Sequence, residues 1–197
     1  LLSPPLLVGV QDIVAWQGRG VVTGANIFSR YLGQSLGAAL RQTAARRGEA
    51  LAIAFYGEEI SFAELLRRVE RLAAFLQHAC SVLPGDRVLL AMQNSPHAII
   101  GYQAIVRAGA VVVPVNPMSV PDEIAYLAAD SGATVALIGA ELVGRFAALV
   151  PEPLGHVVVA AYGDAIPAGT PFRLPQVIGA SVLTDRLPEG FVTWTEA

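Results

Sequence analysis

A chain of 197 residues has room for one domain, or for one large and one partial domain. Hydrophobic residues make up 54% of it and charged residues 15%, which excludes a disordered chain. The net charge is −3 and no basic cluster exceeds an arginine pair, so we expect no nucleic-acid partner and no attraction to an anionic membrane. All thirteen basic residues are arginine, which excludes a catalytic or phosphate-loop lysine within this chain.

The N-terminal region, residues 1–30, has no clear period, and we predict an irregular arm there. Its first ten residues are apolar, but they include two prolines and are far short of the ~20 residues of a membrane helix, so we expect no transmembrane segment. The single cysteine, Cys80, cannot form an internal disulfide and is expected in the core. This cysteine usage agrees with a cytoplasmic location, which we expect.

The first regular elements are a helix and a hairpin. Residues 35–47 repeat apolar positions at helical spacing and end in two arginines and a glycine, which favours a helix. An apolar run at 51–56 and a short returning run at 59–61 then predict a β-hairpin. Its turn is assigned to Gly57 and Glu58.

The clearest amphipathic helix follows the hairpin. Ser61 and Glu64 have the spacing of a capping box, in which each side chain bonds the other residue's backbone N–H. From Phe62 to Leu76 apolar side chains fall on one helical face and most charged side chains on the other. We therefore predict a helix that packs one face into the core.

From Asp86 onward, strands and helices alternate. The predicted strands are 87–92, 110–115, 134–138 and 156–160, and the predicted helices are 95–107, 119–130 and 140–149. The helix at 95–107 is apolar on most sides and is expected to be buried between layers. Apolar strands separated by helices predict a three-layer α/β fold, with a largely parallel sheet flanked by helices and a small β-hairpin beside it.

The C-terminal part has fewer signals. Residues 162–175 are rich in glycine and proline and are interpreted as a loop. Residues 191–197 resemble a short strand that runs into a helix start at Thr193 or Thr195. We therefore expect residues 31–197 to form an α/β subdomain that is incomplete at its C-terminal end.

Three patterns that suggest chemistry have simpler explanations. Gly18, Gly20 and Gly24 approach the dinucleotide-binding fingerprint, but no strand precedes them. Ser95 and His97 lie two apart at a helix start, where their side chains do not face each other, so Ser95 is interpreted as a helix cap. The histidines have no neighbours at metal-ligand spacing, and we expect no metal site.

The loop after the predicted strand 110–115 has two interpretations. Asn116, Pro117 and Met118 follow a predicted strand, and loops beyond the carboxyl ends of parallel strands border ligand crevices. A simple strand-to-helix turn explains the same residues. Arg145, on a later predicted helix, is either a solvated charge or a phosphate ligand.

Several segments together resemble the AMP-forming acyl-CoA synthetases, in order and spacing from about Leu36 to Ile138. They are EISFAEL (59–65), PGDRV (84–88), MQNSP (92–96), AGAVVVPVNP (108–117) and EIAYLAADSGA (123–133). The resemblance is to the N-terminal portion of these enzymes, with long- or medium-chain fatty acid and aryl acid ligases the most similar branches.

The resemblance implies a two-step reaction. A carboxylate attacks ATP to give an acyl-adenylate and pyrophosphate, and the thiol of CoA then displaces AMP. The implied cofactors of the complete enzyme are ATP, Mg²⁺ and CoA. The family's phosphate loop, adenine and Mg²⁺ motifs, ribose-binding aspartate and lid lysine have no counterpart here. We therefore assign no catalytic residue, and expect the chain alone to be inactive and to bind no cofactor tightly.

By analogy with the family, Asn116, Pro117, Met118 and Arg145 are expected near the CoA nucleotide. The expected partners are the remainder of the same enzyme and a small carboxylic acid. A homodimer is compatible with the sequence, which carries no signal on oligomeric state. The alternative is a stand-alone, non-catalytic α/β binding or interaction module.

Overall fold

The computed structural model describes residues 36–179 and 187–197. The arm predicted at 1–30 therefore lies outside the described residues. Contacts divide the chain into a unit of Leu1–Ala39 and a unit of Leu40–Ala197, and the fold described below is that of the second unit. Helix α3 (Leu36–Arg47) confirms the first predicted helix, and its Leu40 is buried in the core.

The hairpin is confirmed, but its turn lies one residue earlier than predicted. Strands β1 (Leu51–Phe55) and β2 (Glu58–Ser61) pair antiparallel, with Phe55 opposite Glu58. The turn residues are therefore Tyr56 and Gly57, with φ angles of 44° and 96°. Two successive positive φ values match the twist of a two-residue hairpin loop, and glycine adopts the second at little cost.

Helix α4 (Phe62–His78) packs its apolar face into the core as predicted. Ser61 Oγ accepts a hydrogen bond from Glu64 N–H at 3.3 Å, which is half of the predicted capping box. The reciprocal half is not formed among the described residues, because the Glu64 carboxylate binds Arg67 and Arg68 instead. Cys80, just after the helix, is buried as expected.

The main sheet has five parallel strands in the order β4-β3-β5-β6-β7. The strands are β3 (Arg87–Ala91), β4 (Val111–Pro114), β5 (Val135–Gly139), β6 (His156–Ala160) and β7 (Phe191–Thr193). The first four confirm the predicted strands. The fifth was predicted as a strand but not as a member of this sheet. Pro114, which lacks a backbone N–H, lies on the edge strand β4, where its missing donor costs no ladder bond.

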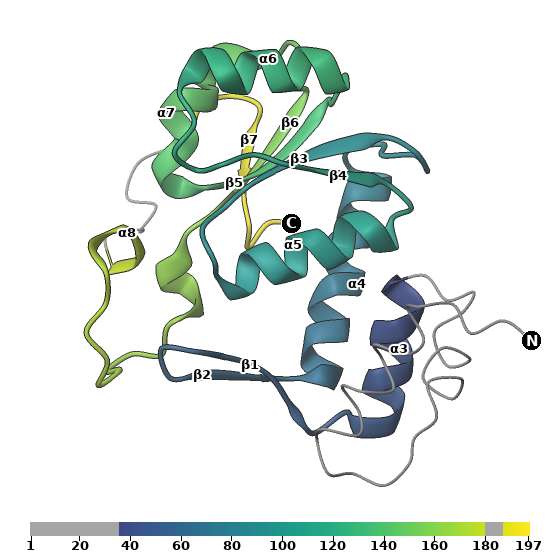
Figure 1. The fold of residues 1–197 in the computed structure, drawn as a ribbon, viewed down its shortest axis with the longest axis vertical. Coiled ribbons are helices and arrows are strands. Elements are labelled where there is room, and N and C mark those ends of the chain that lie inside the picture. The colour runs from purple at the N-terminus through teal and green to yellow at the C-terminus, as the bar shows by residue number, and fades with distance from the viewer. Residues whose placement is uncertain (1–35, 180–186) are drawn as a thin grey trace, which may run out of the picture. The chain divides into compact units, whose positions relative to one another are not determined.

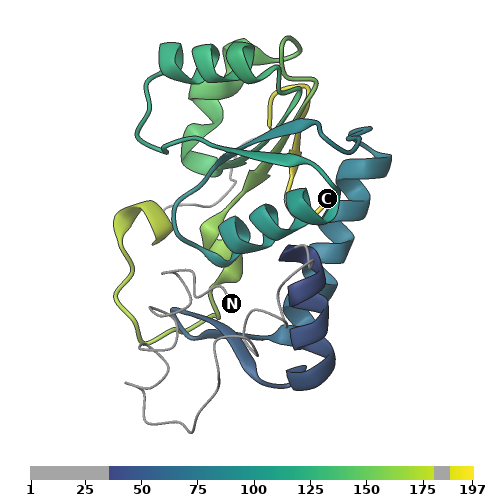
Figure 2. The same cartoon turned by 45° about the vertical axis from the view of Figure 1, so that its right-hand side comes forward.

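Helices cover both faces of the sheet and confirm the three-layer fold (Figure 1). On one face, α4 and α5 (Pro96–Arg107) pack on side chains such as Val135 and Leu137. On the other, α6 (Pro121–Ser131) and α7 (Val143–Phe146) pack on Ala136 and Ile138. Figure 2 shows the same two helical layers, one on each face of the sheet, after a 45° turn. Neighbouring residues of β5 thus enter opposite cores, which explains why this strand is apolar throughout.

Three connecting segments differ from their predictions. The continuous helix expected at 140–149 is a 3-10 turn, η1 (Ala140–Leu142), then α7, then a second 3-10 turn, η2 (Ala147–Leu149). The loop expected at 162–175 begins with the 3-10 turn η3 (Tyr162–Ala165), and a short helix, α8 (Gln176–Gly179), follows it. Helix α5 is not buried on all sides, because Ile99 and Tyr102 are exposed.

A capping box forms directly after β7. Thr193 Oγ1 accepts a hydrogen bond from Glu196 N–H at 3.3 Å, and Thr193 N–H donates to Glu196 Oε2 at 2.8 Å. This reciprocal pair has capping-box geometry and involves Thr193 rather than Thr195, but residues 194–196 form a turn and not the predicted helix start.

Candidate functional site

The sheet topology brings five chain segments to one edge. The strands are parallel, so the loops that follow β3, β4, β5, β6 and β7 all leave from their carboxyl ends. The chain crosses from β3 to its neighbour β4 through α5, and returns past β3 to β5 through α6 on the opposite face. Ligand crevices in open α/β sheets lie at this kind of reversal in strand order.

The four predicted site residues come together at this edge. Arg145 Nη1 donates hydrogen bonds to the carbonyl oxygens of Pro117, at 2.9 Å, and Ser119, at 3.0 Å. Asn116 Oδ1 accepts a bond from Met118 N–H at 2.9 Å, which holds the turn from within. Residues 28 positions apart in the sequence thus form one local structure, which we call the Arg145 turn (residues 116–119 and Arg145).

The Arg145 turn combines a cation with exposed apolar surface. Arg145 is half-buried and forms no ion pair within residues 36–179 and 187–197, and only Nη1 of its guanidinium is used in the bonds to the turn. Met118 is 73% exposed and Val120 is 54% exposed. A guanidinium next to apolar side chains suits a ligand with an anionic group and a flat or apolar body.

A second group of residues at the same edge was not predicted. Tyr162 is fully buried, and its hydroxyl accepts a hydrogen bond from Gln93 N–H at 2.8 Å and donates to Glu141 Oε1 at 3.0 Å. Burial, together with the neighbouring Glu141 carboxylate, raises the pKa of Tyr162 well above its usual range, so the phenol stays protonated. The hydroxyl therefore ties the loops after β3 and β5 to the turn after β6.

Ser95 and His97 have separate roles at the start of α5. Ser95 Oγ accepts a bond from Ala98 N–H at 3.2 Å, which confirms Ser95 as the cap of α5. The imidazole of His97 packs instead against the edge of the Trp194 ring, with centroids 5.0 Å apart. Burial, and the charge of Arg68, lower the pKa of His97 to about 4, so the ring is neutral near pH 7.

The described residues contain no side-chain cluster of the kind that holds a metal ion. Within the parts of the chain that the structure describes, no three His, Cys, Asp or Glu side chains cluster at ligand distance. Mg²⁺ prefers octahedral oxygen ligands, and these residues do not supply such a set. No helix in the same parts is long and apolar enough to cross a lipid bilayer.

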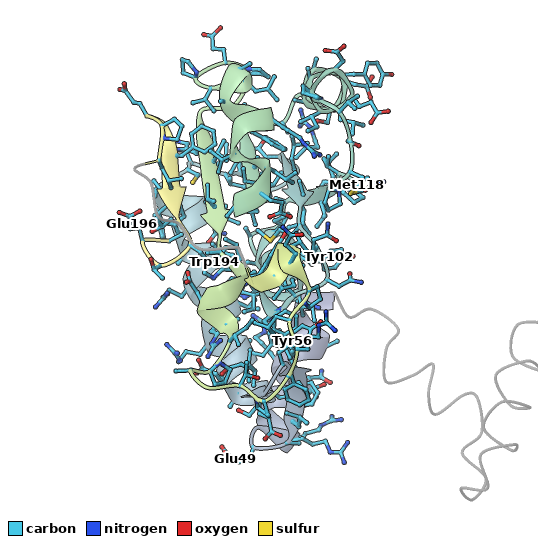
Figure 3. All side chains as sticks on the ribbon, turned by 90° about the vertical axis from the view of Figure 1, so that its left-hand side faces the viewer. Glu49, Tyr56, Tyr102, Met118, Trp194 and Glu196 are labelled. Carbon is cyan, nitrogen blue, oxygen red and sulfur yellow. The ribbon has the colours of Figure 1, made fainter. Side chains whose placement is uncertain are left out.

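The Arg145 turn and the surroundings of Trp194 are separate surfaces. The turn belongs to the face covered by α6 and α7, whereas His97 belongs to the face covered by α5. In Figure 3, Met118 lies towards the right of the view, and Trp194 and Glu196 lie to its left.

Comparisons with known proteins give a consistent family. A family model described as "AMP-binding enzyme" matches residues 40–176. The long-chain-fatty-acid–CoA ligase of Bacillus subtilis (strain 168) is 37% identical over 103 residues, which are 52% of this chain and 18% of that protein. The long-chain-fatty-acid–CoA ligase of Escherichia coli O6:H1 is 33% identical over 134 residues, covering 68% of this chain and 24% of that protein.

A solved structure supports the same fold. It is described as a long-chain-fatty-acid CoA ligase from Rhodopseudomonas palustris, with a TM-score of 0.64 and 24% identity, and the match covers 83% of this chain and 36% of that one. The matched segments thus span less than a quarter of the length of the two relatives. Because the family match covers more than half of its residues, this chain belongs to the AMP-binding enzyme family.

Proposed function

We propose that the protein acts, as part of a longer polypeptide, as an acyl-CoA synthetase that uses ATP. A carboxylate oxygen attacks the α-phosphorus of ATP, pyrophosphate leaves, and the CoA sulfur then attacks the acyl carbonyl and displaces AMP. The observation that carries the proposal is the family match over residues 40–176. The two relatives reported above are both named long-chain-fatty-acid–CoA ligases, which supports a long- or medium-chain fatty acid as the substrate.

The role we propose for this chain is to form one wall of the CoA site. The Arg145 turn supplies a guanidinium whose remaining N–H groups bond no residue in the described part of the chain and can bind a phosphate oxygen. Exposed Met118 supplies apolar surface against which the adenine or ribose of CoA would pack. Asn116 shapes the turn through its side-chain Oδ1, and Pro117 contributes a backbone carbonyl that accepts a bond from Arg145.

The chain contributes no catalytic group in this proposal. Adenylation concentrates negative charge on the phosphate and on the leaving pyrophosphate, and its stabilisation requires positioned cations, Mg²⁺ or backbone donors. The sequence has no lysine, and the described residues have no carboxylate cluster for Mg²⁺. ATP, Mg²⁺ and CoA would therefore be held mainly by the rest of the enzyme. That remainder is the partner that we propose for this chain, and the location that we propose is the cytoplasm.

The CoA role is tested with Arg145→Ala in the complete enzyme. A charge-assisted hydrogen bond contributes about 1.5–3 kcal/mol, so we expect the KM for CoA to rise about tenfold or more. Adenylate formation, measured as ATP–pyrophosphate exchange, should be unchanged because it precedes CoA binding. The matched control is Asn116→Ala, which removes the bond to Met118 N–H but keeps the Arg145 charge. An equal rise in both variants would mean that the turn's shape, and not the guanidinium, supports CoA binding.

The absence of chemistry in this chain is tested with the purified 197-residue protein. We expect no ATP–pyrophosphate exchange above a protein-free control with any of a panel of fatty and aromatic acids. The expectation would be wrong if the chain catalysed ATP–pyrophosphate exchange and a substitution within the chain abolished that exchange. The complete protein should be active in the same assay. If it is inert with every acid, the alternative of a non-catalytic interaction module replaces the synthetase proposal.

A further inference from the structure

A pocket of about 250 Å³ opens on the face of the sheet that α4 and α5 cover. Helix α4 contributes arginines to it, α5 contributes its first turn, η3 contributes an aspartate, and the segment after β7 contributes an indole. The charged and aromatic residues that line it include Glu64, Arg67, Arg68, Arg71, His97, Asp164 and Trp194. None of them belongs to the Arg145 turn, so this pocket is a separate feature from the proposed CoA site.

The charges around the pocket are only partly neutralised. Arg67 and Arg68 both bind the Glu64 carboxylate, at 2.7 and 2.5 Å. Arg71, on the same face of α4, forms no hydrogen bond or ion pair with any residue that the structure describes. Asp164 is exposed and pairs with none of the three arginines. A guanidinium at the pocket wall is therefore left with its hydrogen-bonding capacity open.

His97 provides an independent indication of a ligand. Its side chain lines the pocket and is only 5% exposed, yet its Nδ1 has no hydrogen-bond partner among the described residues. A buried polar atom without a partner is unfavourable, and a ligand bound to it would remove this cost. His97 also lies in the first turn of α5, a 12-residue helix whose N-terminal end favours negative charge.

We infer that this pocket binds the anionic group of a small molecule, a carboxylate or a phosphate, between Arg71 and His97. The Arg71 guanidinium supplies the charge, and the imidazole supplies a hydrogen bond from a neutral ring. The indole of Trp194 lies edge-on to that ring and covers the body of the ligand. This site lies on the opposite face of the sheet from the Arg145 turn. It is therefore an additional binding site beyond the proposed wall of the CoA site.

Trp194 fluorescence provides the test. The chain has two tryptophans, so Trp16→Phe leaves Trp194 as the only indole. In this background the 197-residue chain is titrated with inorganic phosphate and, separately, with benzoate, at constant ionic strength maintained with chloride. We expect a saturable change in Trp194 emission with at least one probe. A response to phosphate alone assigns the site to phosphate groups, and a response to benzoate alone assigns it to carboxylates.

Two arginine variants show whether the effect is specific. Arg71→Gln should weaken binding about tenfold, because one charge-assisted bond is lost. Arg46→Gln makes the same change at an exposed arginine of α3 that is not among the pocket-lining residues, and it should leave binding unchanged. Both positions are exposed, so both variants should fold, which circular dichroism checks. In NMR spectra, the His97 ring resonances should shift on saturation, a change that a purely structural histidine would not show.

Three results would overturn the inference. The first is a linear, non-saturating response to both probes. The second is equal binding by Arg71→Gln and the unchanged chain, or equal weakening by Arg71→Gln and Arg46→Gln. The third is binding by the 197-residue chain that disappears in the complete protein, which would mean that other residues fill the pocket there. None of these results bears on Arg145→Ala and the KM for CoA, so the two proposals fail separately.

Discussion

Gly139 ends β5 at a point that has no room for a side chain. A Cβ atom there would collide with the Tyr162 hydroxyl and with the Glu141 carboxylate, which are hydrogen-bonded to each other directly above it. Gly139→Ala should therefore lower the free energy of unfolding by about 2 kcal/mol, because the bond between these residues must open or the strand must shift. Urea denaturation followed by circular dichroism measures the loss.

Gly144, on α7, is the matched control for this substitution. A Cβ atom there meets nothing within 4 Å, and the residue is helical. Gly144→Ala should leave the protein as stable or stabilise it by up to about 1 kcal/mol, since alanine is the better helix former. An equal loss of unfolding free energy in the two variants would show that the close contacts at Gly139 are not the cause of the loss.

At the scale of residues, the sequence was informative where the signal is local. Ser95 was identified as a cap because a cap depends on residues three positions away. The contact of Arg145 with the 116–118 turn agrees with their grouping, which rested on family resemblance. Tyr162 was missed because its partners, Gln93 and Glu141, lie 69 and 21 positions away, and no local pattern marks a buried phenol.

Glu64 couples the start of α4 to pH. Hydrogen bonds from Arg67, and then from Arg68, lower the pKa of Glu64 to about 2 from its usual 4.5. A carboxylate with a lowered pKa stabilises the fold above its unfolded pKa, and this stabilisation is lost as the pH falls from about 4.5 to 2. Since Glu64 is partly exposed, solvent screening reduces the contribution to about 1 kcal/mol.

Glu64→Gln should therefore destabilise the protein by about 1 kcal/mol at neutral pH, and the difference should shrink towards zero as the pH approaches 2. Urea denaturation of both proteins across this range measures it. Ser61→Ala is the comparison, because its hydroxyl cap does not ionise, so its cost of about 1 kcal/mol should not vary with pH. A constant difference for Glu64→Gln would refute the ionic explanation.

At the scale of elements, periodic patterns located the helices and strands, but tertiary contacts decided their limits. The segment 140–149 has helical composition, yet Gly144 lies inside it and the chain forms 3-10 turns on both sides of α7. The three residues of β7 were too few to indicate a partner strand. Their place beside β6 depends on the pairing of Val157 with Phe191, which no local pattern predicts.

At the scale of the whole molecule, Cys80 reports on unfolding. It is the only cysteine, it is 7% exposed, and burial raises the pKa of its thiol to about 11. Because the thiolate is the reactive form, a disulfide reagent should modify the folded protein at least about 100-fold more slowly than the urea-unfolded chain. A comparable rate in both states would mean that the core around α4 opens without global unfolding.

The order of the sheet has a consequence for biosynthesis. Strand β3, which lies between β4 and β5, is the first of the five to leave the ribosome, and both of its neighbours come later in the chain. Residues 91–135 must be made before β5 can pair with the second edge of β3, which takes several seconds at ordinary translation rates. Val88 and Leu89 are both fully buried in the finished fold. During that interval, the edge of their strand that later pairs with β5 has no partner strand. The nascent chain is thus most exposed to misassociation, and most in need of a chaperone, before Val135 is added.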